Sequence, residues 1–247
     1  MKIAFLADEK PLAAQALRAC IKKYGQADLA KADVVVVLGG DGFMLKTLHA
    51  LLNYQTPVFG LNLGHVGYLL NHYSVDALPD RVAQADQKEL IPLQIKARIG
   101  TGRPLKQYAF NEFSFVRVSP QAARLNVSIY EQGRKVRPFI QREVFADGLI
   151  VATPMGTSGY YASAQGVPVD DNQNVIAVQS ICARKGLSAI VAPDSLVNVE
   201  VQEKEKRSVC IDRDGQDRVL GVRSATIQQA YSKSMTLLKD KNLDLTR

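Results

Sequence analysis

Continuous apolar runs alternate with helix-like spacing of apolar residues along the first third of the chain. Each run predicts a buried strand, and in the segment that follows it apolar residues recur every three or four positions, as on one face of a helix. The predicted strands are residues 1–7, 32–40 and 57–63, and the predicted helices are residues 11–24, 42–52 and 74–85, the last interrupted or begun near Pro79. Because strands that alternate with helices favour parallel pairing, we predict a doubly wound α/β domain over residues 1–88.

Two of these helices indicate which side chains to expect in the core. In the segment 11–24, the apolar residues expected on one face are Leu12, Ala16, Leu17, Cys20 and Ile21. In the segment 42–52, the residues at helical spacing are Leu45, Leu48 and Leu52. We expect both stripes to pack against the sheet.

The pattern changes to short, closely spaced strands after about residue 88. The predicted strands are residues 92–100, 107–118, 124–133, 136–154, 189–203, 207–216 and 219–230. Turn signals separate several of them, namely Gly100-Thr101-Gly102, Glu131-Gln132-Gly133 and Asp214-Gly215. We therefore predict a β-rich, sandwich-like second domain over residues 89–225. A C-terminal segment, residues 226–247, follows; its residues 234–245 are expected to be helical or irregular and are a candidate to pack back on the first domain.

The composition is that of a globular protein with anionic partners. Of the 247 residues 47% are hydrophobic and 22% charged, which suffices for a sizeable core. No apolar run approaches the roughly 20 residues that span a bilayer, so no membrane association is expected. The formal net charge of +7 favours anionic ligands, but the basic residues are scattered, so a generally cationic protein is the alternative to a nucleic-acid platform. Trp is also absent; if the charge serves a specific ligand, we expect phosphorylated small molecules and no nucleic acid. The widely spaced Cys20, Cys182 and Cys210, with no signal peptide, indicate free thiols and a cytoplasmic location.

The stretch Gly39-Gly40-Asp41-Gly42 lies between a predicted buried strand and a predicted helix. Backbone N–H groups and the positive end of the helix dipole suit a phosphate at such a turn, and glycines let its oxygens approach. A carboxylate there would repel phosphate, so Asp41 indicates either a Mg²⁺ ligand or a base that accepts a proton from an attacking hydroxyl. The alternative is that Asp41 caps the helix N-terminus.

Asn111 and Glu112 are adjacent polar residues within the alternating stretch "FNEFSF". Adjacent residues of a strand face opposite sides, so both side chains reach one ligand only at a strand end or a bulge. An amide and a carboxylate placed together recognise vicinal hydroxyls, as on a ribose. The alternative is a surface turn of the strand without a ligand.

Residues 145–166 are rich in small and hydroxyl side chains and poor in charge. A strand leads into a loop of Gly, Thr and Ser that suits close approach of a polar ligand, and Tyr160 or Tyr161 could stack on a base there. Asp147, just before the strand, could bind an exocyclic amine or a ribose. The alternative is a flexible surface loop, which the scarcity of charge makes less attractive.

In their order along the chain, these motifs resemble the NAD kinase family. GGDG, "NLGHVGYL", the Asn-Glu pair and "DGLIVATPMGTSGYYASAQG" are similar to that family's GGDG, NxGxxGFL-type segment, NE pair and DG…TPTGSTAY…S loop, and the resemblance covers the chain to about residue 220. It implies an α/β domain and a β-rich domain with the active site between them. The implied reaction transfers the γ-phosphoryl group of ATP to the 2′-hydroxyl of the adenosine ribose of NAD, with Mg²⁺ or another divalent cation. A homodimer or homotetramer is also implied.

The resemblance further implies roles for individual residues. Asp41 matches the aspartate proposed to activate the ribose hydroxyl, and Gly39, Gly40 and Gly42 would shape the phosphate site. The implied contacts with the dinucleotide are Asn111 and Glu112 at its ribose and adenine groups, Asp147 at its nicotinamide end, and Thr153, Ser158, Tyr160 and Ser163 along the NAD pocket. No residue is assigned to a metal.

Some positions depart from the family pattern. Phe43 stands where a Thr usually follows GGDG, Met155 replaces a hydroxyl residue, and either Asp212 or Asp214 is the counterpart of a later Asp-Gly turn. These departures keep open a dinucleotide-binding regulator that has lost turnover. A lipid kinase of the diacylglycerol or sphingosine type also has a GGDG domain, but the long loop and the Asn-Glu pair argue against it.

Overall fold

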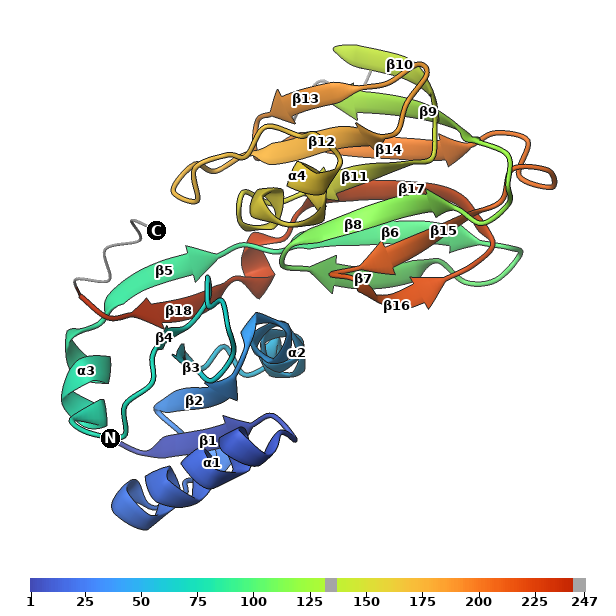
Figure 1. The fold of residues 1–247 in the computed structure, drawn as a ribbon. Coiled ribbons are helices and arrows are strands. Elements are labelled where there is room, and N and C mark those ends of the chain that lie inside the picture. The colour runs from blue at the N-terminus through green and yellow to red at the C-terminus, as the bar shows by residue number, and fades with distance from the viewer. Residues whose placement is uncertain (132–136, 242–247) are drawn as a thin grey trace. The chain divides into compact units, whose positions relative to one another are not determined.

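The computed structural model describes residues 1–131 and 137–241 of the chain. They form two compact units: Met1–Leu90 together with the chain from Ser232 onward, and Ile91–Tyr231 (Figure 1). The first unit is α/β and the second is β-rich with few helices, so the predicted fold class is confirmed. The chain passes between the units after Leu90 and after Tyr231, whereas the sequence pattern changes after residues 88 and 225.

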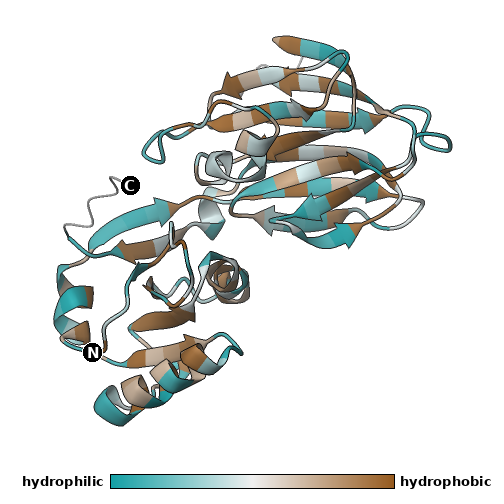
Figure 2. Cartoon of the chain, viewed as in Figure 1, coloured by the Kyte–Doolittle hydropathy of each residue, from teal (hydrophilic) through white to brown (hydrophobic). Residues whose placement is uncertain are grey.

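The first unit is a mostly parallel sheet in the order β1-β2-β3-β18-β5, with β4 paired to β3. Its strands are β1 Ile3–Ala7, β2 Val34–Gly39, β3 Val58–Asn62, β4 Asn71–His72, β5 Asp86–Leu90 and β18 Met235–Lys239. Its helices are α1 Pro11–Tyr24, the 3-10 helix η1 Leu29–Lys31, α2 Asp41–Leu51 and α3 Leu78–Gln84. Only β5 is antiparallel to its neighbour, β18. Figure 2 shows the apolar character of β2, which is buried along its whole length.

Helices cover both faces of this sheet. Residues of α1 and α3 share a core cluster with Phe59 of β3, whereas Gly60, the next residue, lies so close to Met44 of α2 that a Cβ on it would approach the Met44 Cε to 2.4 Å. Since successive strand residues face opposite sides, α2 lies on the face opposite α1 and α3. The predicted doubly wound arrangement is therefore present.

The buried face of α1 is rotated from the predicted one. Its fully buried residues are Ala13, Ala16 and Cys20, while Leu12 is 55% exposed and Ile21 is 36% exposed. Small side chains at positions 13 and 16 allow the helix to approach the sheet closely, and the longer Leu12 is left outside. The predicted face was correct for Ala16 and Cys20 and wrong for Leu12 and Ile21.

The C-terminal segment contains a strand that the sequence did not predict. Residues 234–245 were expected to be helical or irregular, yet Met235–Lys239 forms β18, parallel to β3 and antiparallel to β5. Met235, Leu237 and Leu238 are buried there. Residues 242–245 of that prediction lie outside the described part of the chain.

The second unit consists of two antiparallel sheets, in the orders β10-β9-β14-β17-β6-β7 and β13-β12-β11-β8-β15-β16. The strands are β6 Leu93–Ile99, β7 Leu105–Ala109, β8 Glu112–Arg117, β9 Ala123–Tyr130, β10 Ile140–Ala146, β11 Gly148–Ala152, β12 Ile176–Ile181, β13 Ser188–Val191, β14 Leu196–Val201, β15 Val209–Arg213, β16 Gln216–Val219 and β17 Val222–Gln229. The short helices are η2 Met155–Ser158 and α4 Tyr160–Ser163, and η3 Tyr231–Lys233 follows at the exit from the unit.

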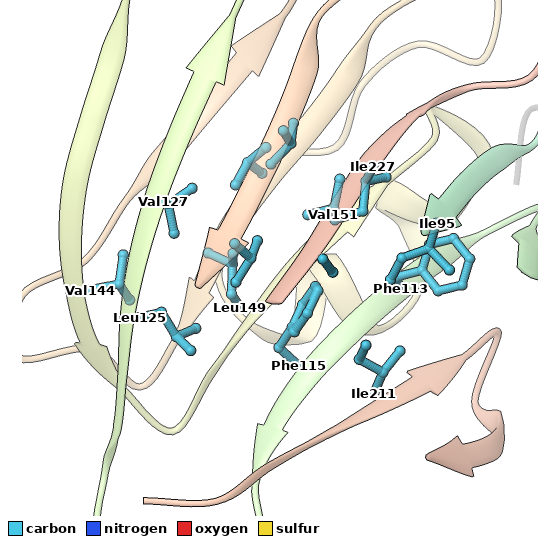
Figure 3. Close-up of a cluster of buried hydrophobic side chains, with 14 of the residues drawn as sticks. Ile95, Phe113, Phe115, Leu125, Val127, Val144, Leu149, Val151, Ile211 and Ile227 are labelled. Carbon is cyan, nitrogen blue, oxygen red and sulfur yellow. The ribbon is translucent and has the colours of Figure 1, made fainter. Parts of the chain in front are cut away.

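One core cluster lies between these sheets. Alternate residues of most of the strands point into it, among them Phe113 and Phe115 of β8 facing Ile95 and Ile227 of the other sheet (Figure 3). The residues between them face outward, so Glu112 and Ser114 lie on the opposite face of β8. On that outer face Tyr161 of α4 packs in a separate apolar cluster with side chains of β11 and β12.

Two of the predicted long strands each divide where the chain crosses from one sheet to the other. Residues 107–118 split into β7 and β8 around Asn111, and residues 136–154 split into β10 and β11 at Asp147. The prediction also missed β12, and Gln132-Gly133 of the predicted turn lie outside the described residues. Both crossing points carry candidate ligand-binding side chains.

No helix within residues 1–131 and 137–241 is long and apolar enough to cross a membrane.

Candidate functional site

The glycine turn of the first unit joins β2 directly to α2. Gly40 is the N-cap of α2, with φ −111° and ψ 179°, an extended conformation that any residue adopts. A Cβ built on Gly40 or on Gly42 would meet no atom within 4 Å. Neither backbone strain nor packing within the chain therefore requires glycine at these two positions.

Gly39, in contrast, is closely packed, and its contact with Phe43 shows a structural role for that ring. A Cβ on Gly39 would lie 3.0 Å from the Phe43 ring and 3.3 Å from the Cβ of Asp8. The ring at position 43 therefore packs against the end of β2 and fills the inner side of the turn. The Phe43 ring does not cover Gly40 and Gly42, on the open side of the turn.

Asp41 does not cap α2, because the helix has no side-chain cap. Instead its carboxylate accepts hydrogen bonds from the backbone N–H groups of Tyr68, at 3.1 Å, and Leu69, at 2.9 Å. Each carboxylate oxygen uses one acceptor position in this way and retains another. The capping alternative is wrong: Asp41 is half-buried, and backbone N–H groups of a neighbouring loop hold its carboxylate.

That loop, residues 63–69, is the "NLGHVGYL" motif without its first residue. Gly64 lies against Gly40, since a Cβ on Gly64 would be 3.6 Å from the Gly40 Cα. Lys239 of β18 donates to the carbonyl oxygens of Tyr68, at 2.7 Å, and Leu70, at 3.2 Å. The structure thus brings two motifs of the first unit together and fixes the loop that orients Asp41.

In the second unit, Asn111 and Glu112 lie at the crossing from β7 to β8. The N–H groups of three consecutive residues, Phe110, Asn111 and Glu112, donate to the carboxylate of Asp214 at 3.0, 2.8 and 3.0 Å. The N–H of Asp214 returns a hydrogen bond of 3.0 Å to the carbonyl of Glu112. Asn111 therefore lies at a strand end, the condition under which the pair can serve one ligand.

Thr153 donates hydrogen bonds to the carbonyl groups of the same junction. Its hydroxyl donates to the Phe110 carbonyl at 2.6 Å, and its N–H donates to the Asn111 carbonyl at 2.8 Å. The Thr153 side chain is buried, so in this structure its hydroxyl holds the Asn111–Glu112 backbone. Contact between Thr153 and a ligand remains a prediction.

Glu112 is buried next to the carboxylate of Asp214, and it is 6% exposed. Burial, and then the charge of Asp214, raise its pKa from 4.5 to about 8. Near neutral pH its carboxyl group is therefore protonated, and it can donate one hydrogen bond and accept another. This suits a hydroxyl, which is itself both donor and acceptor.

The loop after β11 presents one tyrosine and hides the other. Tyr161 is 1% exposed in the apolar cluster on β11 and β12, whereas Tyr160 is 40% exposed. Burial raises the pKa of Tyr160, and Asp212, Cys182, Asp147 and Glu112 raise it further, so these groups lie around the phenol. Of the two predicted stacking residues, only Tyr160 is available.

Ser158 and Ser163 are exposed on η2 and α4. Their hydroxyls bond to carbonyl oxygens one turn earlier, of Met155 at 3.2 Å and Gly159 at 3.4 Å. Asp147 lies at the other end of β11 from Thr153, about 20 Å along the strand, and forms an ion pair of 2.6 Å with Arg117. The structure brings Asn111, Glu112 and Thr153 into direct contact, but Thr153 and Asp147 are separated by the length of β11.

The sequence also left open which aspartate of the later turn matters, and the geometry separates the two. Asp214 holds the Asn111–Glu112 junction, whereas Asp212 pairs with Arg218 at 2.8 Å. The positive φ of Asp214, 48°, is the conformation that an Asp-Gly turn favours, so the turn signal pointed to it. Its partners, about a hundred residues earlier, could not be inferred from spacing.

Comparison with known proteins decides the family. The profile of the ATP-NAD kinase N-terminal domain matches residues 7–84, and that of the ATP-NAD kinase C-terminal domain matches residues 111–236. The chain belongs to the NAD kinase family. Relatives named NAD kinase include one from Cereibacter sphaeroides, 39% identical over 87% of this chain and 83% of its own length, and one from Hyphomonas neptunium, 34% identical over 97% and 92%.

Solved structures of the family share the fold at low sequence identity. An NAD kinase from Archaeoglobus fulgidus in complex with ATP superposes with a TM-score of 0.76 and 20% identity, over 98% of this chain and 94% of that one. Yeast NADH kinase complexed with NADH gives a TM-score of 0.81 and 18% identity, over 99% and 85%. The relatives named NAD kinase favour an NAD kinase over the lipid kinase and regulator alternatives.

Proposed function

We propose that the chain is an NAD kinase that transfers the γ-phosphoryl group of ATP to the 2′-hydroxyl of the adenosine ribose of NAD. A bond forms between the ribose 2′-oxygen and the γ-phosphorus, and the bond from that phosphorus to the β,γ-bridging oxygen breaks. The products are NADP and ADP, with the hydroxyl proton released to a base. Membership of the NAD kinase family supports this reaction, and the observation that carries it is the turn around Asp41.

Asp41 is the proposed base. A ribose hydroxyl is a poor nucleophile at neutral pH, so a carboxylate within hydrogen-bond reach both orients it and accepts its proton. The two N–H groups that hold Asp41 leave one acceptor position free on each oxygen. Gly40 and Gly42 beside it face open space, where phosphate oxygens could approach the N-terminus of α2.

A divalent cation such as Mg²⁺ would bind at this turn with one protein carboxylate, and substrate phosphates and water would supply the other ligands. Within residues 1–131 and 137–241, no group of three or more His, Cys, Asp or Glu side chains could hold a metal ion. Mg²⁺ is commonly bound by substrate phosphates, water and one or two carboxylates, and Asp41 is the carboxylate that fits. When bound, the cation would neutralise charge on the phosphates of ATP.

The acceptor is proposed to bind through the second unit. Asn111 and the protonated Glu112 would hold ribose hydroxyls, and Tyr160 would stack on a base. Ser158 and Ser163 would line the same pocket, and Asp147 would face the nicotinamide end. A homodimer or homotetramer remains a prediction from the family resemblance, and a cytoplasmic location remains a prediction from the widely spaced cysteines.

The proposed function is tested by incubating the purified protein with ATP, Mg²⁺ and NAD and measuring NADP. We expect NADP to form in proportion to enzyme and time, and to disappear when ATP is omitted. Binding of NAD by calorimetry without any NADP would contradict the kinase and favour a dinucleotide-binding regulator. If the protein neither binds NAD nor forms NADP, the proposed NAD-binding site is contradicted as well as the kinase activity.

A further inference from the structure

The carboxylate of Asp214 accepts backbone hydrogen bonds that a neighbouring strand would otherwise accept. Between β7 and β8 the chain changes sheets, and at such a crossing neighbouring strands do not supply acceptors for every N–H group. Asp214 accepts all three N–H groups of residues 110–112, while Thr153 satisfies the carbonyls of Phe110 and Asn111. The backbone that carries Asn111 and Glu112 is thus held on both sides.

A carboxylate is well suited to this position but costly there. Its two oxygens offer about four acceptor sites, enough for three N–H donors, and hydrogen bonds to an ionised acceptor are stronger than neutral ones. Asp214 is only 8% exposed, however, and a second buried carboxyl group, Glu112, lies beside it. Burying a charge next to an acid lowers stability unless hydrogen bonds offset the cost, and natural proteins accept such costs mainly at functional sites.

We propose that Asp214 is a positioning residue for the acceptor nucleotide: it fixes the backbone of residues 110–112 and thereby aims the side chains of Asn111 and Glu112 at the ribose hydroxyls. The inference rests on the proposed function. Asp214 does not itself touch the nucleotide. Burial of Glu112, reinforced by the charge of Asp214, also raises the pKa of Glu112, so that its protonated carboxyl group offers a donor and an acceptor to a hydroxyl pair.

The other charged groups around Glu112 leave Asp214 as its main electrostatic neighbour. On α4 the nearest titratable group is Tyr160, whose pKa is raised above its ordinary value, so it stays neutral. On β15 the candidates are Asp212, which pairs with Arg218, and Arg213, which pairs with Asp217. The paired residue on β11, Ala152, does not titrate. Removing the charge of Asp214 should therefore lower the pKa of Glu112.

The test compares Asp214→Asn with Asp217→Asn, a matched control in the same hairpin. Both aspartates have positive φ, 48° and 50°, which asparagine tolerates, so neither change strains the backbone. In Asp214→Asn the amide oxygen still accepts two of the three N–H groups, and the charge is lost. NAD binding is measured by calorimetry from pH 6 to pH 9, and the KM for ATP is measured alongside.

For Asp214→Asn we expect the Kd for NAD to rise about tenfold or more, the effect of losing one charge-assisted hydrogen bond. The KM for ATP should stay unchanged. In the unmodified protein NAD affinity should fall as pH rises past about 8, where Glu112 ionises; in Asp214→Asn that fall should begin at lower pH. Asp217→Asn should behave like the unmodified protein.

Unchanged NAD affinity with an unchanged pH midpoint in Asp214→Asn would overturn the inference while leaving the kinase intact. A lower NAD affinity together with a higher KM for ATP and a lower melting temperature would also overturn it, since that pattern indicates general destabilisation. Failure of the unmodified protein to bind NAD or form NADP would instead overturn the proposed function. The outcomes of the two proposals are therefore distinguishable.

Discussion

Gly156 packs directly on the carbonyl group of Asn111. A Cβ on Gly156 would come within 2.3 Å of the Asn111 oxygen, closer than any real Cβ contact. The start of η2 therefore fits the Asn111–Glu112 junction only with glycine at this position, and the loop after β11 packs closely against the Asn-Glu pair.

From this contact we predict that Gly156→Ala separates the loop from the junction. The variant should be less stable by about 1–3 kcal/mol, the usual cost of forcing extra atoms into a packed site, and should bind NAD more weakly. Gly159→Ala is the control, because its Cβ would lie 3.6 Å from the nearest atom, an ordinary contact. Urea unfolding and NAD calorimetry give the two quantities. Equal stability of both variants would contradict the tight contact.

The raised pKa of Glu112 predicts a pH-dependent stability. Between about pH 4.5 and pH 8 the folded protein holds a proton on Glu112 that the unfolded chain has released. The free energy of unfolding therefore falls as pH rises through this window. Glu112→Gln cannot ionise, so its stability relative to the unmodified protein should be greater at pH 8.5 than at pH 5.5. Urea unfolding at the two pH values measures this; no change in the difference would show that Glu112 titrates normally.

A substitution at Gly42 tests whether glycine is needed there for stability or for ATP binding. It lies inside α2, where alanine stabilises a helix by about 1 kcal/mol relative to glycine, and its Cβ would meet no atom of the chain. If phosphate oxygens approach the turn there, Gly42→Ala should be as stable as the unmodified protein or more so. Its kcat/KM for ATP should nevertheless fall by about tenfold, the loss of roughly one 1.4 kcal/mol interaction. A stable variant with full activity would place the phosphates elsewhere.

The first unit was largely predictable because its elements are local. Residues 11–24 form α1 as predicted, and α2 begins at Asp41, one residue before the prediction, since a buried apolar run and helical spacing specify each element within a few residues. The strand β18 was missed because its partners, β3 and β5, lie far away in the chain. A short apolar run does not reveal its pairing.

The second unit shows the same limit at the candidate site. The alternating pattern of "QYAFNEFSFVRV" continues through Asn111 without a break, so sequence alone predicts one strand. The crossing between sheets is held by Asp214 and Thr153, whose bonds to this stretch join distant positions. The type of candidate residue was visible in the sequence, whereas the contacts that fix it were not.

The central claim is that Asp41 accepts the proton of the ribose hydroxyl, and Asp41→Asn tests it most directly. Asparagine keeps an acceptor for one of the two N–H groups at Tyr68 and Leu69, and Asp28→Asn, at the N-cap of η1, is a control for the same change in the same unit. The measurement is kcat for NADP formation, with NAD affinity determined separately by calorimetry. We predict that Asp41→Asn lowers kcat by about 10²–10⁴-fold while NAD affinity is retained; a variant with near-normal kcat would contradict the account.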